Sequence, residues 1–153
     1  MPGRSYYVET SVWGMIPKGQ PREMRRASLR FLRRQLQFFA SPVALYEIGA
    51  CAELARAQIM EVFDALQPTI LEVTAGIEEL AGFYIETGIV AKRKRPDALH
   101  VAVATVHEMD VLVSWNHRHI ANIRKTEQYR GANLIRGYSN TPQILTPIEV
   151  LHA

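Results

Sequence analysis

Short apolar segments alternate with longer segments of helical periodicity along this chain. Residues 5–8 and 111–115 are rich in β-branched and aromatic side chains, a composition typical of buried strands. Between residues 21 and 39, apolar side chains recur every three or four positions, which predicts an amphipathic helix. Strands that alternate with helices in this way predict an α/β domain built on a mainly parallel sheet.

The remaining elements follow from proline, threonine and the same periodicity. Further helices are predicted over residues 42–66, 77–87, from 96 onward and 120–130, and further strands over residues 39–41, 69–73 and 143–145. Thr146, Pro147 and Glu149 have the spacing of a capping box, so a last helix begins there. No internal repeat, low-complexity tract or linker divides the sequence, and we therefore expect one domain over residues 1–153.

Four polar residues stand at the boundaries or within the apolar parts of these elements. Glu9 and Asn116 each follow a predicted strand, Asp97 begins a helix, and Glu47 lies among apolar residues of another. Ligands of open parallel sheets bind at the carboxyl ends of the strands. Oxygen ligands favour Mg²⁺ or Mn²⁺ over zinc. Spacing alone equally allows a helix-start acid, a surface glutamate, a strand-end charge and a turn asparagine.

Composition narrows the class of protein. The chain is 48% hydrophobic and 22% charged, as in ordinary globular proteins, and no segment approaches the ~18 apolar residues of a membrane span. Its one cysteine, Cys51, excludes an intramolecular disulfide. With no apolar signal segment at the start, we expect a cytoplasmic protein with no membrane partner. The net charge of +3 mildly favours anionic partners.

Basic residues and histidines near these acids are candidates for contact with phosphate groups. They are Lys92, Arg93, Lys94 and Arg95, which precede Asp97, and Arg22, Arg26, Arg30 and Arg33, which share one face of the predicted helix 21–39. His117 and His119 directly follow Asn116. A solvated surface is the alternative for every one of them. His100 and His107 share an apolar helix, but no set of His and Cys residues has the spacing of a zinc site.

Three segments of the chain resemble the PIN-domain family, and most closely its VapC-type toxin ribonucleases. They are YYVETSVWG at 6–14, SPVALYEIGAC at 41–51 and PDALHVAVATVHEMDVLVSWNHRHIAN at 96–122. The closing GYSNTPQILTPIEVL is similar to the tail of one VapC subgroup. The resemblance implies a single PIN domain with a three-layer α/β/α sandwich, a Mg²⁺ or Mn²⁺ site, and the activity of an endoribonuclease toxin from a type II toxin–antitoxin pair.

The resemblance also implies roles for individual residues. Glu9, Glu47, Asp97 and Asn116 match the metal-binding and catalytic positions, and Ser11 matches a small hydroxyl residue near the first acid. Most relatives have aspartate where this chain has Glu9. The family further implies an RNA substrate, a small antitoxin protein and a homodimer. The alternative is a weakly active or inactive PIN-fold module that binds RNA or a protein partner, which the longer Glu9 and the neutral Asn116 favour.

Overall fold

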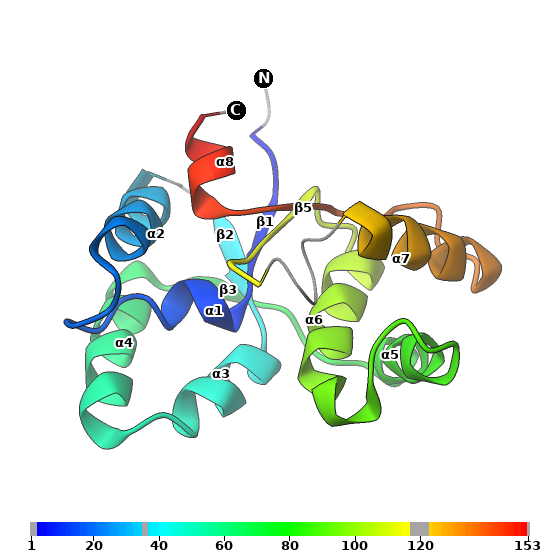
Figure 1. Ribbon diagram of the computed structural model, residues 1–153, viewed down its shortest axis with the longest axis horizontal. Helices are drawn as coiled ribbons and strands as arrows, with labels where there is room; N and C mark the ends of the chain where they lie inside the picture. The colour runs from blue at the N-terminus through cyan, green and yellow to red at the C-terminus, as the bar shows by residue number, and fades with distance from the viewer. Residues whose placement is uncertain (1–2, 35–36, 117–122, 153) are drawn as a thin grey trace.

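The structure is a computed structural model that describes residues 3–34, 37–116 and 123–152 of the chain. Five parallel strands form one sheet in the order β3-β2-β1-β4-β5 (Figure 1). The strands are β1 (Tyr6–Val8), β2 (Phe38–Ala40), β3 (Thr69–Ile70), β4 (Val111–Val113) and β5 (Gln143–Leu145). The predicted α/β class with a parallel sheet is therefore confirmed.

Helices cover both faces of this sheet and complete a three-layer sandwich (Figure 1). One face carries α1 (Thr10–Trp13), α2 (Arg22–Arg34), α3 (Pro42–Gly49) and α4 (Glu53–Leu66). The other carries α5 (Ala75–Glu86), α6 (Arg95–Val106), which follows the 3₁₀ turn η1 (Lys92–Lys94), and α7 (Ile123–Ile135). The last helix, α8 (Pro147–Leu151), packs against α2.

The central strands are apolar on both faces because each face is covered by helices. Tyr7 and Leu112 point into the layer formed with α5, α6 and α7. Val8, Val111 and Val113 point into the opposite layer, with α1 to α4. Strands buried on both sides read as continuous apolar runs rather than alternating ones, as β4 does.

Some predicted boundaries are wrong. The helix predicted over 42–66 is two helices, because the chain turns at residues 50–52, after Gly49, where the backbone N–H groups of Ala50 and Cys51 donate to carbonyls of the last turn of α3. The helix predicted over 21–39 ends at Arg34, and β2 takes the residues from Phe38. The strand predicted over 69–73 has only two residues at the sheet edge.

Other boundaries were predicted correctly or nearly so. The helix predicted over 77–87 is α5, which begins two residues earlier because the Thr74 hydroxyl accepts the backbone N–H of Ile77 and caps it. The capping box of Thr146 and Glu149 is present at α8, with both of its hydrogen bonds. Among the described residues, no helix is long and apolar enough to cross a membrane.

The sheet order places the ends of β1 and β4 next to each other. Val8 pairs with Val113, and the backbone N–H of Glu9 donates to the Val113 carbonyl at 3.1 Å. After each of these strands the backbone leaves the sheet: Glu9 leads into α1, and Ser114 leads toward Asn116. The residues that follow β1 and β4 therefore lie together at the carboxyl ends of these two strands.

Candidate functional site

A cavity of about 320 Å³ lies where α3, η1, α6 and the end of β4 meet. It is lined by Glu47, Arg93, Lys94, Pro96, Asp97 and Asn116. The structure therefore brings together three of the four residues predicted to form the site. It adds two of the four basic residues of the run 92–95 that precedes Asp97. Glu9, the fourth, does not line this cavity.

Glu47 is held from behind by a buried histidine. The His100 Nε2 lies 2.6 Å from the Glu47 Oε1, and the Thr10 hydroxyl donates to the same oxygen at 2.6 Å. His100 is fully buried, whereas the Glu47 side chain is 29% exposed. The carboxylate is thus fixed in place while part of it still faces the cavity.

The histidine is itself fixed by a tyrosine from the central strand. The Tyr7 hydroxyl lies 2.6 Å from the His100 Nδ1 and 2.6 Å from the Ser41 Oγ. A proton on Nε2 can be donated to Glu47, which leaves Nδ1 to accept from the Tyr7 hydroxyl. Burial raises the pKa of that Tyr7 hydroxyl, so it keeps its proton for this bond.

Opposing influences act on the Glu47 carboxyl. Burial raises its pKa, but the hydrogen bond from His100, the positive charge of His100 when protonated and the hydrogen bond from Thr10 lower it more strongly. The net result is a pKa below the ordinary value. Glu47 is therefore a carboxylate at neutral pH.

Glu9 lies in a different environment, with 4% of its surface exposed. Its side chain caps α1: the Oε1 accepts the Ser11 backbone N–H at 2.7 Å and the Ser114 hydroxyl at 3.1 Å. Burial raises the pKa of its carboxyl, the charge of His100 when protonated and the bonds from Ser11 lower it less, and the charge of Glu47 raises it further. The carboxyl of Glu9 is thus close enough to sense both Glu47 and His100.

Ser11 joins α1 to the end of β4. Its hydroxyl accepts the Trp115 backbone N–H at 2.8 Å and lies 3.3 Å from the Ser114 hydroxyl. The Ser114 hydroxyl also accepts the backbone N–H of Asn116 at 2.9 Å. These bonds fix the backbone of Asn116 beside the cavity. Ser11 therefore supports the site through Ser114 and Trp115, the two residues before Asn116.

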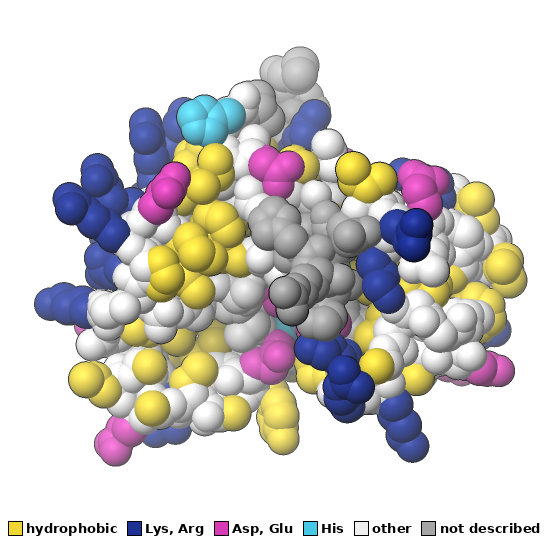
Figure 2. Space-filling view, in the orientation of Figure 1, with side chains coloured by type: hydrophobic (Ala, Val, Ile, Leu, Met, Phe, Trp, Pro, Cys, Tyr) yellow, Lys and Arg dark blue, Asp and Glu magenta, His cyan; other side chains and the backbone are white. Residues whose placement is uncertain are grey.

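The predicted basic run divides between the cavity and its surroundings. Arg93 and Lys94 line the cavity, whereas Lys92 and Arg95 are exposed next to them. Figure 2 shows Lys and Arg side chains gathered at the lower centre of the view, where Figure 1 places the start of α6. His117 and His119, the other predicted phosphate contacts, lie outside the described residues.

The donor set of the cavity suits a hydrated divalent cation. Within the described ranges, no three His, Cys, Asp or Glu side chains are close enough together to hold one metal ion by themselves. Mg²⁺, however, is commonly bound through one or two carboxylates and keeps several waters. Glu47, Asp97 and Asn116 offer oxygen ligands, which fit Mg²⁺ or Mn²⁺ and not zinc.

Sequence analysis missed five residues that shape this site: Tyr7, Thr10, Ser41, His100 and Ser114. Their contacts join segments far apart in the chain, and no local pattern predicts such contacts. One signal was available for His100, which lies one helical turn after Asp97 and therefore shares its side of α6.

We expect loss of the His100 side chain to destabilise the fold. His100→Ala leaves the Tyr7 hydroxyl and the Glu47 carboxylate without their partner and opens a cavity, so the free energy of unfolding should fall by about 2–4 kcal/mol. Urea denaturation at neutral pH measures it. The control is His107→Ala, which removes one bond to the Glu72 carbonyl and should cost about 0.5–1.5 kcal/mol. Equal losses in the two variants would contradict the central role of His100.

The raised pKa of Glu9 predicts a stability that falls as pH rises. The folded protein holds the proton of Glu9 at pH values where the unfolded chain has released it, so folding is favoured below the ordinary pKa of 4.5 and loses that contribution as pH rises through the folded-state value. Each unit of the raised pKa amounts to about 1.4 kcal/mol.

Glu9→Gln should remove this pH dependence. Stability curves of both proteins, measured in EDTA across the acidic and neutral range, should diverge above pH 4.5, with the wild type losing more stability. Parallel curves would show that Glu9 titrates normally. Glu47→Gln is the control of opposite sign: the lowered pKa of Glu47 stabilises the fold above pH 4.5, and this stabilisation is lost as pH falls.

Solved structures of toxins share this architecture. A toxin–antitoxin complex from Klebsiella pneumoniae superimposes with a TM-score of 0.60 at 21% sequence identity, over 78% of this chain and 93% of that chain. VapC20 of Mycobacterium tuberculosis, a sarcin–ricin loop cleaving toxin, matches with a TM-score of 0.60 at 16% identity, over 90% and 99%. VapBC2 of Rickettsia felis, bound to a DNA fragment from its promoter, matches with a TM-score of 0.52 at 13% identity, over 92% and 98%.

Sequence comparison adds no relative to these structures. No protein-family profile and no curated protein sequence matches the chain. The likeness therefore rests on the arrangement of strands and helices, which extends over most of both chains in each pair. The chain has the PIN fold of VapC-type toxins, as the sequence resemblance implied.

Proposed function

We propose that this protein is a divalent-metal-dependent endoribonuclease and the toxin of a type II toxin–antitoxin pair. The observation that carries the proposal is the cavity in which Glu47, Asp97 and Asn116 face Arg93 and Lys94. Two carboxylates beside two cations suit a site that holds a metal ion and a phosphate group together. The fold supports the proposal, because a structure that shares it is a toxin that cleaves the sarcin–ricin loop.

The residues of the cavity have distinct tasks in this proposal. Glu47, fixed by His100 and Thr10, presents a carboxylate in a set position. Asp97 lies in the first turn of α6, so the helix fixes the position of its backbone. Arg93 and Lys94 attract the phosphate backbone of RNA without reading its sequence. Glu9 lies outside the lining of the cavity and supports it by capping α1, whose Thr10 donates to Glu47.

Glu47, Asp97 and Asn116 would hold Mg²⁺ or Mn²⁺, mostly through water. When bound, such an ion lowers the pKa of a water molecule and neutralises charge on the phosphate. Asn116 contributes an oxygen without charge, held beside the cavity by the bond from its backbone to Ser114. No side chain is required to form a covalent intermediate.

The proposal includes partners that act on this site. A small antitoxin protein would inhibit the toxin, as the likeness to a toxin–antitoxin complex and to VapBC2 supports. A homodimer, which the sequence resemblance implies, and a place in the cytoplasm, which the single cysteine favours, remain part of the proposal.

A binding module with little or no catalysis is the second candidate. One observation favours it: Glu9 caps α1 and lies outside the cavity, so fewer carboxylates meet there than the sequence predicts. In that case the basic residues around the cavity bind RNA or a protein partner, and no phosphodiester bond of the RNA is cleaved.

We expect cleavage of RNA that requires Mg²⁺ or Mn²⁺ and is abolished by EDTA. Asp97→Asn removes one of the two negative charges that line the cavity and should lower the rate at least ~100-fold, as the loss of one strong electrostatic stabiliser does. Cleavage of total RNA, followed over time with each metal, measures it. The matched control is Asp64→Asn, the same change on the exposed face of α4, which should keep the wild-type rate.

The two candidate functions differ in this experiment. A wild-type rate in Asp97→Asn would remove Asp97 from the site. A wild-type protein that binds RNA in EDTA but cuts none with either metal would establish the binding module instead.

A further inference from the structure

A larger cavity of about 1020 Å³ lies between α2 and α8, and we call it the arginine groove. Six arginines of α2 line it: Arg22, Arg25, Arg26, Arg30, Arg33 and Arg34. It shares no lining residue with the candidate active site. Figure 2 shows Lys and Arg side chains along the left edge of the molecule, where Figure 1 places α2.

The charges of the groove are not neutralised by the fold. Arg25 donates to the Ile16 carbonyl at 2.8 Å, but the other five arginines are exposed and have no ion-pair partner among the described residues. Glu23 is the single acidic residue in the lining. The groove is therefore a concentrated positive surface that a negatively charged partner can neutralise.

This arrangement opposes the stability of α2. Arg22, Arg26, Arg30 and Arg34 follow one another at four-residue intervals, and each like-charge pair at this spacing destabilises a helix by about 0.2–0.5 kcal/mol. Oppositely charged residues at these positions would stabilise the helix instead. A row of arginines that opposes folding points to a role in binding.

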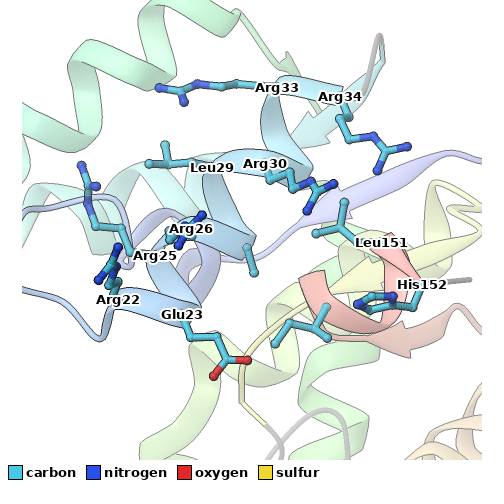
Figure 3. A pocket seen from close by; sticks show the side chains of 12 residues that line it. Arg22, Glu23, Arg25, Arg26, Leu29, Arg30, Arg33, Arg34, Leu151 and His152 are labelled. Atoms are coloured by element: carbon cyan, nitrogen blue, oxygen red, sulfur yellow. The ribbon is translucent and has the colours of Figure 1, made fainter.

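The floor of the groove is apolar, and its charges stand around that floor. Ala27 and Leu29 of α2 are each 8% exposed, and Ile148 and Leu151 of α8 are half-buried beside them. Figure 3 shows Arg30 and Arg34 extending on the side of Leu151 and His152, where the guanidinium groups face the open groove. The charged chemistry that the groove presents is thus a row of guanidinium groups beside an apolar floor.

We propose that the arginine groove binds the phosphate backbone of an RNA strand, at a distance from the site that cuts it. This inference rests on the proposed function, since the RNA is the substrate of that site. The thirteen residues of α2 span about 18 Å between their first and last Cα atoms, and a stacked strand carries about five phosphates over that length. Five exposed arginines match this number, and arginine binds phosphate in a bidentate manner.

The test measures how salt affects RNA binding in EDTA, where no cleavage occurs. The probe is a fluorescein-labelled oligouridylate of about 20 nucleotides, long enough for the groove and the active site together. The variant Arg26→Gln/Arg30→Gln/Arg34→Gln should lower the slope of log K against log salt by roughly two units, because each lost phosphate contact on a single strand contributes about 0.7. Affinity near 0.1 M salt should fall at least about tenfold.

Two controls separate the groove from general charge and from folding. Arg4→Gln/Arg130→Gln/Arg136→Gln removes the same number of charges from exposed positions outside both cavities and should keep the wild-type slope. The Arg→Lys triple at 26, 30 and 34 keeps the charges and should keep most of the slope. Far-UV circular dichroism verifies that all three variants are folded.

A wild-type slope in the glutamine variant overturns the proposal. So does a variant that keeps its RNA slope but loses affinity for a labelled polyglutamate peptide, which would assign the groove to an acidic protein segment. RNA cleavage is measured on the same preparations. If the wild type cuts RNA and the slopes are equal, the groove inference alone fails, whereas a wild type that neither binds nor cuts RNA ends the proposed function too.

Discussion

The buried imidazole of His100 joins the elements that form the candidate active site. It extends from α6 and contacts Tyr7 of β1, Thr10 of α1 and Glu47 of α3, all within 3.2 Å. A buried donor or acceptor that loses its partner costs about 1–3 kcal/mol, so these bonds constrain one another. Because Asp97 lies one turn before His100 on the same helix, the constraint also sets where Asp97 faces Glu47 across the cavity.

The same imidazole places two carboxyl groups in contrasting environments. Glu47, hydrogen-bonded to His100, has a lowered pKa and remains charged, while the more deeply buried Glu9 has a raised pKa. Two interacting acids whose pKa values are pushed apart take different roles. Glu47 presents a permanent charge to the cavity, whereas Glu9 caps α1 and, because its pKa is raised, keeps its proton to a higher pH.

Much of this arrangement follows from local sequence, and the rest depends on long-range contacts. The ends of β1 and β4 were predictable because apolar runs stop at polar residues, and Asp97 because proline precedes it in a first helical turn. The break at residues 50–52 was not, since backbone hydrogen bonds make it. The position of Glu9 outside the cavity depends on its capping bond to the Ser11 backbone and on its bond to Ser114, which is more than a hundred residues away. The His100 contacts likewise need the register of β1 against β4.

The central claim is that the fold positions Glu47 and Asp97 to hold one divalent cation in the cavity between α3 and α6. Anomalous diffraction from crystals soaked in Mn²⁺ tests it most directly, because it locates the ion without depending on activity. The account predicts one strong peak in that cavity, with a carboxylate oxygen of Glu47 or Asp97 bound directly to the ion or bridged to it by a single water. A saturating soak that leaves the cavity without a peak, or places the ion elsewhere, would contradict it.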